Sequence, residues 1–282
     1  MRPATLAASV APVLAGTAIA VHAGGARWAA GVGALVVAVA MQVGVNFSND
    51  YSDHVRGADN ASRTGPLRAA SSGVVRPQAV RLAAIGAFGL AAVAGLLLSL
   101  AVDARLLVVG AACILAAWLY TGGPRPYGYL GLGEVFVFVF FGLVATCGTV
   151  YVETGRVTSL AILFGCALGF LATAILVLNN LRDIETDAAA GKRTLATRIG
   201  RERTLILLVV IVCAAFAIPI GVFMFKLALV TIMLIHFAIP IAAASVRTAF
   251  ANRSGPALVA ALKRMAVAEL AYALLLTAGL LL

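Results

Sequence analysis

The feature that most constrains this chain is the recurrence, along its whole length, of apolar runs of about twenty residues, the length that spans a bilayer core. In lipid, a spanning segment must satisfy its own backbone hydrogen bonds, which only helices and closed barrels achieve. Of the 282 residues, 62% are hydrophobic and 11% are charged, whereas soluble domains carry about 25% charged residues. The sequence therefore predicts an all-α, polytopic membrane protein with one transmembrane domain over residues 1–282.

The apolar runs divide into nine expected helices that surround a central cavity. Their ranges are 6–22, 28–49, 79–102, 105–120, 132–151, 158–180, 203–224, 227–246 and 261–281. The second and the sixth helix run in the same direction across the membrane if all nine cross it. The polar segments that follow these two helices are therefore expected on the same side.

The basic residues indicate which side faces the cytoplasm. All but four of the 21 Lys and Arg residues fall in alternate gaps between the apolar runs, the exceptions being Arg27, Arg105, Arg156 and Lys226. Cytoplasmic loops are enriched in Lys and Arg. The distribution predicts a multi-pass protein of the cell membrane with its amino terminus in the cytoplasm and its carboxyl terminus outside. The net charge of +10 is explained in this way, so nucleic-acid binding is not expected.

Acidic side chains gather directly after the second expected helix. Asn46 and Asn49 precede Asp50 and Asp53. If the helix continues through this stretch, residues three or four positions apart share a face. Two carboxylates and two amide oxygens would then be able to bind one cation or polar ligand.

A similar stretch follows the sixth expected helix. Asn179 and Asn180 lead into Asp183 and Asp187, which are four positions apart and are expected on one face, whereas Glu185 is expected in solvent. One such pair occurs in many helices by chance. Two stretches, each led by Asn at the end of a helix of the same direction, favour a functional site.

Clustered carboxylates at a membrane boundary need compensating positive charge. Magnesium is bound in proteins by a few carboxylates together with phosphate oxygens. Two clusters facing one cavity would hold magnesium ions that bridge a diphosphate, and nearby cations would neutralise the remaining phosphate charge. The candidate cations are Arg56, Arg63, Arg68, Lys192 and Arg193.

The segment between the fourth and fifth expected helices is the third distinctive feature. It reads YTGGPRPYGYLGLGE from Tyr120 to Glu134, and Arg125 is its only cation. The segment could be a tight loop with interfacial tyrosines. Arg125 could equally contact a diphosphate or an acceptor carboxylate, and the residues alone do not decide between these interpretations.

These three segments resemble the UbiA superfamily of intramembrane aromatic prenyltransferases. Asn49, Asp50 and Asp53 match the family's Asn-Asp-x-x-Asp motif, while Asp183 and Asp187 match its Asp-x-x-x-Asp motif. The resemblance implies that these residues bind magnesium and that the four aspartates are catalytic. The family's usual further Asp falls here on a glycine, with an aspartate two positions later, so a metal role at that point is less secure.

Longer segments resemble the branch of the family that acts on 1,4-dihydroxy-2-naphthoate. They are NDYSDHVRGAD, TGPLRAASSGVV, YTGGPRPYGYLGLGE, NNLRDIETD and GKRTLATRIG. The resemblance implies transfer of a polyprenyl group from its diphosphate to this acceptor in menaquinone synthesis, with loss of pyrophosphate and carbon dioxide. It implies contacts of Tyr120 and Arg125 with diphosphate or acceptor. The site would also contain Asn46, Asn179 and Asn180, and the prenyl tail would lie in an apolar groove.

Two other functions compete with this interpretation. A member of the same family could use another aromatic acceptor, such as 4-hydroxybenzoate or a heme precursor, but the GGPRPYGYLGLGE segment argues against it. A cation-coupled transporter could also use two acidic clusters. Transporters place their coupling residues near the middle of the bilayer, whereas these carboxylates follow the helices. The sequence does not indicate the prenyl chain length or the oligomeric state.

Overall fold

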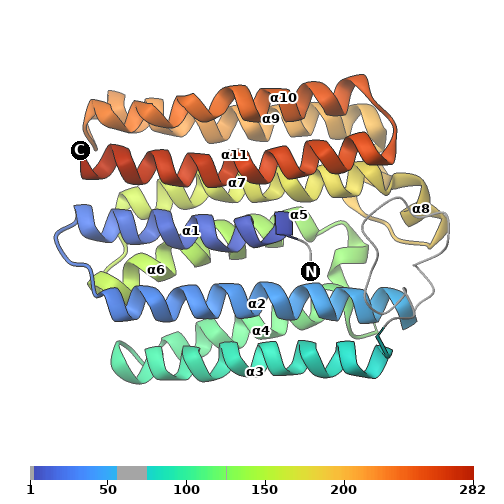
Figure 1. Cartoon of the computed structure of the whole chain (residues 1–282), viewed down its shortest axis with the longest axis horizontal. Helices are drawn as coiled ribbons and strands as arrows, with labels where there is room; N and C mark the ends of the chain where they lie inside the picture. Colours follow the sequence, from blue (N-terminus) through green and yellow to red (C-terminus); the bar gives the residue numbers. More distant parts are fainter. Residues whose placement is uncertain (1–2, 56–74, 125) are drawn as a thin grey trace.

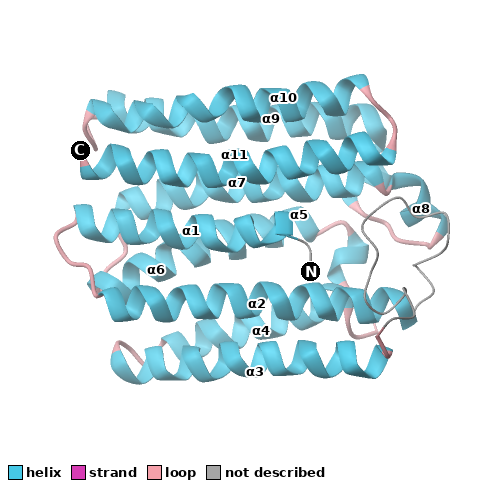
Figure 2. Cartoon of the chain, in the orientation of Figure 1, coloured by secondary structure: helices cyan, strands magenta, loops and turns pink. Residues whose placement is uncertain are grey.

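The computed structural model describes residues 3–55, 75–124 and 126–282. Every regular element in these ranges is a helix (Figure 2). Seven elements are long helices. They are α1 (Pro3–His22), α2 (Trp28–Val55), α3 (Pro77–Ala101), α4 (Leu106–Thr121), α7 (Ser159–Arg182), α9 (Leu195–Met224) and α11 (Gly255–Leu281).

Two further long segments are composites, and two short helices lie between the long ones. The composites are α5 (Gly133–Val137) with η2 (Phe138–Val144) and α6 (Ala145–Thr154), and η3 (Val230–Ala238) with α10 (Ile239–Ala251). The short helices, which the hydropathy pattern did not predict, are η1 (Tyr127–Leu130) and α8 (Ile184–Ala189). They lie in polar connections, where apolar periodicity gives no signal.

In the described part of the chain, eight helical segments are long and apolar enough to span a membrane. The ninth apolar helix, α4, has 16 residues and is shorter than a typical span. Each of the nine expected helices corresponds to one of these segments, so the predicted fold class is confirmed. The boundaries differ by several residues at some ends. For example, α9 begins at Leu195, before its predicted start at 203, and it is kinked at Gly200, whose φ is 76°.

The helices lie side by side in one bundle (Figure 1). The end of α2 and the short helix α8 lie at one end of the bundle, and the carboxyl terminus lies at the other. We call the end that carries α8 and the aspartates of the two acidic stretches the acidic end, and the other the far end. Both acidic stretches therefore lie on the same side, as their helix directions predicted.

The packed core occupies only part of the bundle. Its buried members come from α1, α6, α7, α9, η3, α10 and α11, with Phe164, Leu168 and Tyr272 among the largest side chains. In membranes, close helix contacts depend on small residues. At Gly142 of η2 and Gly169 of α7, the two backbones approach so closely that a side-chain carbon on either would overlap the other helix. The helices α2, α3 and α4 instead border a cavity.

The two acidic stretches are built differently. The helix α2 continues six residues beyond its predicted end at 49, so Asp50 and Asp53 are helical. In contrast, α7 ends at Arg182, and Asp183 (φ −99°, ψ 10°) separates it from α8. The two aspartates of the second stretch are therefore not on one continuous helix. The Asp187 N–H still donates to the Asp183 carbonyl at 2.7 Å, which preserves the spacing of one helical turn.

Candidate active site

A cavity of about 560 Å³ lies between the helices and connects the two acidic stretches. Its walls come from α1, α2, α3, α4, the α5–α6 segment and α7, with the segment after α8 closing part of the acidic end. The residues on the wall include nine of those that the sequence nominated. They are Asn46, Asn49, Asp53, Tyr120, Asn179, Asn180, Asp183, Asp187 and Lys192.

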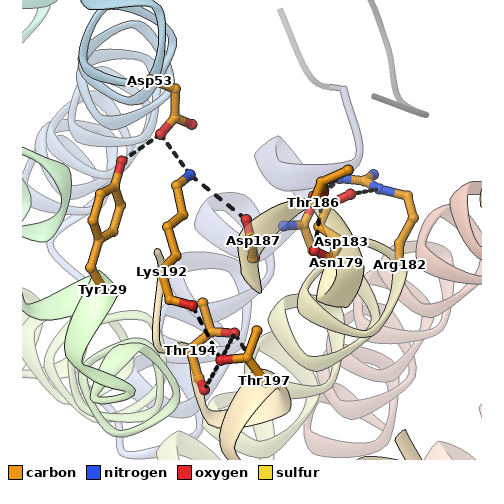
Figure 3. A network of polar contacts seen from close by, with 10 residues as sticks. All are labelled: Asp53, Tyr129, Asn179, Arg182, Asp183, Thr186, Asp187, Lys192, Thr194 and Thr197. Carbon is orange, nitrogen blue, oxygen red and sulfur yellow. Dashed lines mark hydrogen bonds and ion pairs between the residues drawn. The ribbon is translucent and has the colours of Figure 1, made fainter. Parts of the chain in front are cut away.

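Lys192 links the two acidic stretches across this cavity (Figure 3). Its Nζ donates to Asp53 Oδ1 at 2.8 Å and lies 3.8 Å from Asp187 Oδ1. Tyr129 Oη donates to the same Asp53 oxygen at 2.7 Å. The side chains of Lys192 and Asp53 are 11% and 5% exposed, so the charges compensate each other where water screens them little.

The backbone after α8 places Lys192 at this point. Gly191 has a φ of 71°, a left-handed conformation that favours glycine and reverses the chain. The Lys192 N–H then donates to the Asp187 carbonyl at 2.8 Å. Thr194 begins α9 by accepting a hydrogen bond on Oγ1 from the Thr197 N–H at 3.3 Å. This turn directs the lysine side chain toward Asp187 of α8 and Asp53 of α2.

Asp183 is bonded to its own neighbour, Arg182. Arg182 Nε donates to Asp183 Oδ1 at 2.7 Å, and its Nη2 contacts Asp183 Oδ2. The same Nη2 donates to Asn179 Oδ1 at 2.9 Å. The guanidinium group therefore fixes two wall residues of the second stretch at once (Figure 3).

The asparagines of the first stretch are each bonded to another helix. Asn49 Oδ1 accepts a hydrogen bond from Thr121 Oγ1 of α4 at 2.8 Å. Asn46 Nδ2 donates to Thr5 Oγ1 of α1 at 2.9 Å. These contacts fix the register of α1, α2 and α4 where the polar wall of the cavity begins.

Asn180 is bonded to a carboxylate that the sequence did not nominate. Its Nδ2 donates to Glu134 Oε1 at 3.0 Å, and Glu134 is 7% exposed. Glu134 Oε2 is buried and has no hydrogen-bond partner among the described residues. A buried carboxylate facing the Asn180 amide orients the NH₂ group toward Glu134, which leaves the Asn180 carbonyl oxygen for other ligands.

An aromatic wall follows the polar groups. The rings of Tyr127 and Phe136 are stacked with centroids 3.9 Å apart, and Phe140 continues the series at 5.9 Å. Tyr120 meets Tyr127 edge to face at 5.5 Å. Tyr127 Oη donates to the Ala116 carbonyl at 2.8 Å, and burial raises the pKa of Tyr127. The Tyr127 hydroxyl therefore remains a protonated donor that fixes this wall.

The donor groups at the acidic end fit magnesium bound together with phosphate. In the ranges that the structure describes, no three His, Cys, Asp or Glu side chains are close enough to hold a metal by themselves. Magnesium is usually bound through one or two carboxylates, with water and substrate phosphate completing its six ligands. Asp53 and Asp187 provide such carboxylates from opposite sides, and the Lys192 ammonium between them marks a place where positive charge is stabilised.

Some nominated residues lie elsewhere. Asp50 is buried but is not on the cavity wall, and the Arg193 side chain is exposed and also off the wall. Glu185 is exposed, as predicted. Four nominated cations, Arg56, Arg63, Arg68 and Arg125, lie outside the described residues.

Sequence reasoning missed four residues that hold the site together. They are Thr121, Tyr129, Glu134 and Arg182. Three of them lie in the segment from Tyr120 to Glu134, in which the sequence singled out only Tyr120 and Arg125. Their partners are 46 to 76 positions away in the sequence, so no local pattern could identify them.

The fold and the site together are those of a membrane protein that binds an amphipathic ligand. One end of the cavity carries carboxylates, amides and an ammonium group, and the remainder is apolar and aromatic. This arrangement suits a ligand with a polyanionic head, bound through cations, and a long apolar tail.

The UbiA prenyltransferase family matches residues 9–276, and the chain belongs to this family. It is 43% identical to the 1,4-dihydroxy-2-naphthoate octaprenyltransferase of Mycobacterium tuberculosis, over 99% of this chain and 94% of that protein. It is 40% identical to the Escherichia coli protein of the same name, over 71% of this chain and 67% of that protein.

Solved structures share the fold. A UbiA homolog from Aeropyrum pernix K1, solved in its apo form, matches with a TM-score of 0.75 at 15% identity, over 100% of this chain and 98% of that chain. A UbiA homolog from Archaeoglobus fulgidus, bound to DMAPP and Mg²⁺, matches with a TM-score of 0.65 at 17% identity, over 98% and 97%.

Proposed function

We propose that this protein transfers a polyprenyl group from polyprenyl diphosphate to 1,4-dihydroxy-2-naphthoate. The reaction releases pyrophosphate and carbon dioxide and gives the quinol form of demethylmenaquinone, in the synthesis of menaquinone. The observation that carries the proposal is the cavity itself, in which both acidic stretches and Lys192 lie at one end and apolar walls continue from them. The names and the high identity of the two bacterial relatives support the choice of acceptor.

The acidic end binds the diphosphate in this proposal. Asp53, Asp183 and Asp187, with the amides of Asn49 and Asn180, provide hard oxygen ligands for magnesium. Magnesium held by these residues would supply the positive charge that stabilises the diphosphate as a leaving group. We also retain the motif residue Asp50 and the nominated Asn46 and Asn179, together with the four arginines outside the described ranges, as proposed contributors. Arg193, whose side chain is exposed and off the wall, is not among them.

Lys192 is the proposed donor to the diphosphate. Its ammonium compensates the carboxylates of Asp53 and Asp187. From this position it donates to a phosphate oxygen, which stabilises the leaving pyrophosphate. Tyr129, bonded to Asp53, keeps that carboxylate in place.

The aromatic wall suits both the allylic cation and the acceptor. The faces of Tyr120, Tyr127 and Phe136 carry partial negative charge, which attracts a cation. An electron-rich naphthoate ring packs well against such faces in offset or edge-on geometry. Carbon–carbon bond formation at the acceptor carbon that bears the carboxylate, followed by loss of carbon dioxide, restores the aromatic ring.

We infer that the acidic end faces the cytoplasm. All but four of the Lys and Arg residues lie in the segments assigned to this side by the sequence, which agrees with the positive-inside rule. In this orientation the amino terminus is inside, the carboxyl terminus is outside, and charged substrates enter from the cytoplasm.

The direct test incubates the purified protein in detergent with magnesium, a radiolabelled polyprenyl diphosphate and either 1,4-dihydroxy-2-naphthoate or 4-hydroxybenzoate. Lipid-soluble product with naphthoate alone is expected. Product with hydroxybenzoate alone would place the chain in another branch, and no product with either would contradict the proposal.

Two variants test the site. Asp50→Ala and Asp183→Ala are each expected to abolish product while the purified protein retains its thermal transition. Loss in Asp183→Ala with full activity in Asp50→Ala would restrict the chemistry to residues on the cavity wall. Full activity in Asp183→Ala would contradict the assigned site.

A further inference from the structure

The cavity extends far beyond the space that a diphosphate and a naphthoate ring occupy. Beyond Asn49 on α2 its wall runs as far as Ala34, and beyond Thr121 on α4 it runs as far as Leu106. Asn49 and Thr121 are hydrogen-bonded to each other, so both walls start at the same level. Each wall covers 15 positions, which corresponds to about 22 Å at 1.5 Å per residue.

The half of this cavity nearer the far end has a wall that behaves as apolar toward a ligand. Ala34, Val37, Leu98 and Leu107 are among its wall residues. Two hydroxyl groups on this part of the wall, Ser99 and Thr149, donate to carbonyls of their own helices at 2.7 Å. They therefore offer their protons to the backbone rather than to a ligand, and the wall suits a hydrocarbon chain.

Three glycines keep the far half open. Gly95 of α3, Gly110 of α4 and Gly148 of α6 are all on the wall. A side-chain carbon placed on any of them would have no atom within 4 Å. Close packing requires glycine at Gly142 but not at these three positions. A larger side chain at any of the three would project into free space of the cavity.

We propose that these three glycines set how much of the prenyl chain the protein accommodates, a limit of four to five isoprene units. The inference rests on the proposed function. An extended chain advances about 1.2 Å per bond, by analogy with the extended backbone, so each four-bond isoprene unit covers about 5 Å of the 22 Å wall. Units beyond the fifth lie outside the cavity, so the octaprenyl group named for the relatives would leave about three units in lipid.

The position of Gly110 determines which units it affects. It lies 11 positions from Thr121, about 16 Å from the level where the wall begins. The first three units end before this point, and the fourth passes it. A large side chain at residue 110 therefore blocks donors of four or more units and leaves shorter donors unaffected.

The experiment measures kcat/KM for donors of two to eight isoprene units with the naphthoate acceptor. For the native protein, kcat/KM is expected to stay constant beyond five units. For Gly110→Leu and Gly148→Leu, donors of two and three units are expected to keep kcat/KM within about twofold of the native protein. Donors of four or more units should lose at least tenfold. Gly89→Leu is the matched control, because Gly89 is on α3 with equally open space but is exposed and off the wall.

A second measurement does not depend on the folding of the variants. A non-hydrolysable prenyl thiolodiphosphate with a photoreactive group in the fourth unit is expected to label α3, α4 or α6, and one with the group in the seventh unit is expected to label lipid or detergent. Labelling of the protein from both positions, or equal loss for all donors in the leucine variants, would overturn the inference. Absence of any product from the native protein with every donor would instead refute the proposed reaction.

Discussion

The two ends of the same cavity are stabilised in opposite ways. At the acidic end, Asp53, Lys192 and Asp187 form a network that joins α2 to the segment after α8. Toward the far end, the wall consists of small and aliphatic residues whose few hydroxyl groups bond to their own helices. The proposed reaction therefore depends on a few residues at the acidic end, whereas the far end determines only the shape of the cavity.

The two acidic stretches also differ from each other. Asp53 is bonded to residues 76 and 139 positions away, which are Tyr129 and Lys192. Asp183 is bonded to the adjacent Arg182. These two partners of the first carboxylate are distant in the sequence, whereas Arg182, a partner of the second, is adjacent to it. Substitution of Tyr129 should therefore disturb Asp53 while the Arg182–Asp183 contact is kept.

The largest effect in this comparison is expected at Lys192. Lys192→Met removes the cation that faces both Asp53 and Asp187 and the proposed donor to the leaving pyrophosphate. Loss of one such preorganised donor typically lowers kcat by about 100-fold or more. Steady-state kinetics with the naphthoate acceptor measure the change.

Arg193 provides the matched control, since it is adjacent, has the same charge and is exposed. Arg193→Met is expected to stay within about twofold of native kcat, as exposed substitutions usually do. Lys192→Arg should recover part of the lost rate because it restores the charge. Equal losses in Lys192→Met and Arg193→Met would show that total charge, rather than the bridge, matters.

A smaller effect is expected at Glu134, which touches the second stretch through Asn180. Glu134→Leu leaves the buried Asn180 amide without its acceptor, which should lower the free energy of unfolding by about 1–3 kcal/mol. Because Asn180 is then free to turn, activity should fall by about tenfold. Glu134→Gln keeps an oxygen for the same bond and should recover most of the activity.

The informative quantity for the Glu134 variants is the KM for the prenyl diphosphate, measured at saturating naphthoate and compared with the thermal transition. A role in orienting Asn180 raises this KM in Glu134→Leu, in addition to the fall in Tm that the unpaired amide causes, and Glu134→Gln restores the KM. A fall in Tm with an unchanged KM would mean that Glu134 serves packing alone.

The smallest effect is expected at the far end. Tyr151 of α6 donates from its hydroxyl to Asp103, in the connection between α3 and α4, and this hydrogen bond lowers the pKa of Asp103 below its ordinary value of 3.8. Tyr151→Phe should lower Tm by roughly 2 °C, the scale of a single weak contact in a chain of this size. Activity at neutral pH should not change.

The pH dependence of this effect has a definite sign. Because the folded protein holds the pKa of Asp103 low, the contribution is complete above the ordinary pKa and is lost as the pH falls through the lowered value. The Tm difference between native protein and Tyr151→Phe should thus be constant from pH 5 to 8 and shrink below pH 4. A difference that grows toward acidic pH would contradict the assigned hydrogen bond.

The sequence alone determined the membrane class, the nine apolar segments and the common side of the two acidic stretches. These properties follow from hydropathy and from residue spacing along one helix, which are local quantities. Even the family could be identified in this way, because its motifs are contiguous segments such as NDYSDHVRGAD and NNLRDIETD.

Only the tertiary structure decided which of these residues meet. It placed Asp53 rather than Asp50 on the cavity wall, selected Lys192 over Arg193, and brought Tyr129, Glu134 and Thr121 to the site. Each of these outcomes depends on the rotation and register of helices that are far apart in the sequence. Side-chain packing between helices fixes rotation and register, and a hydropathy pattern does not contain that information.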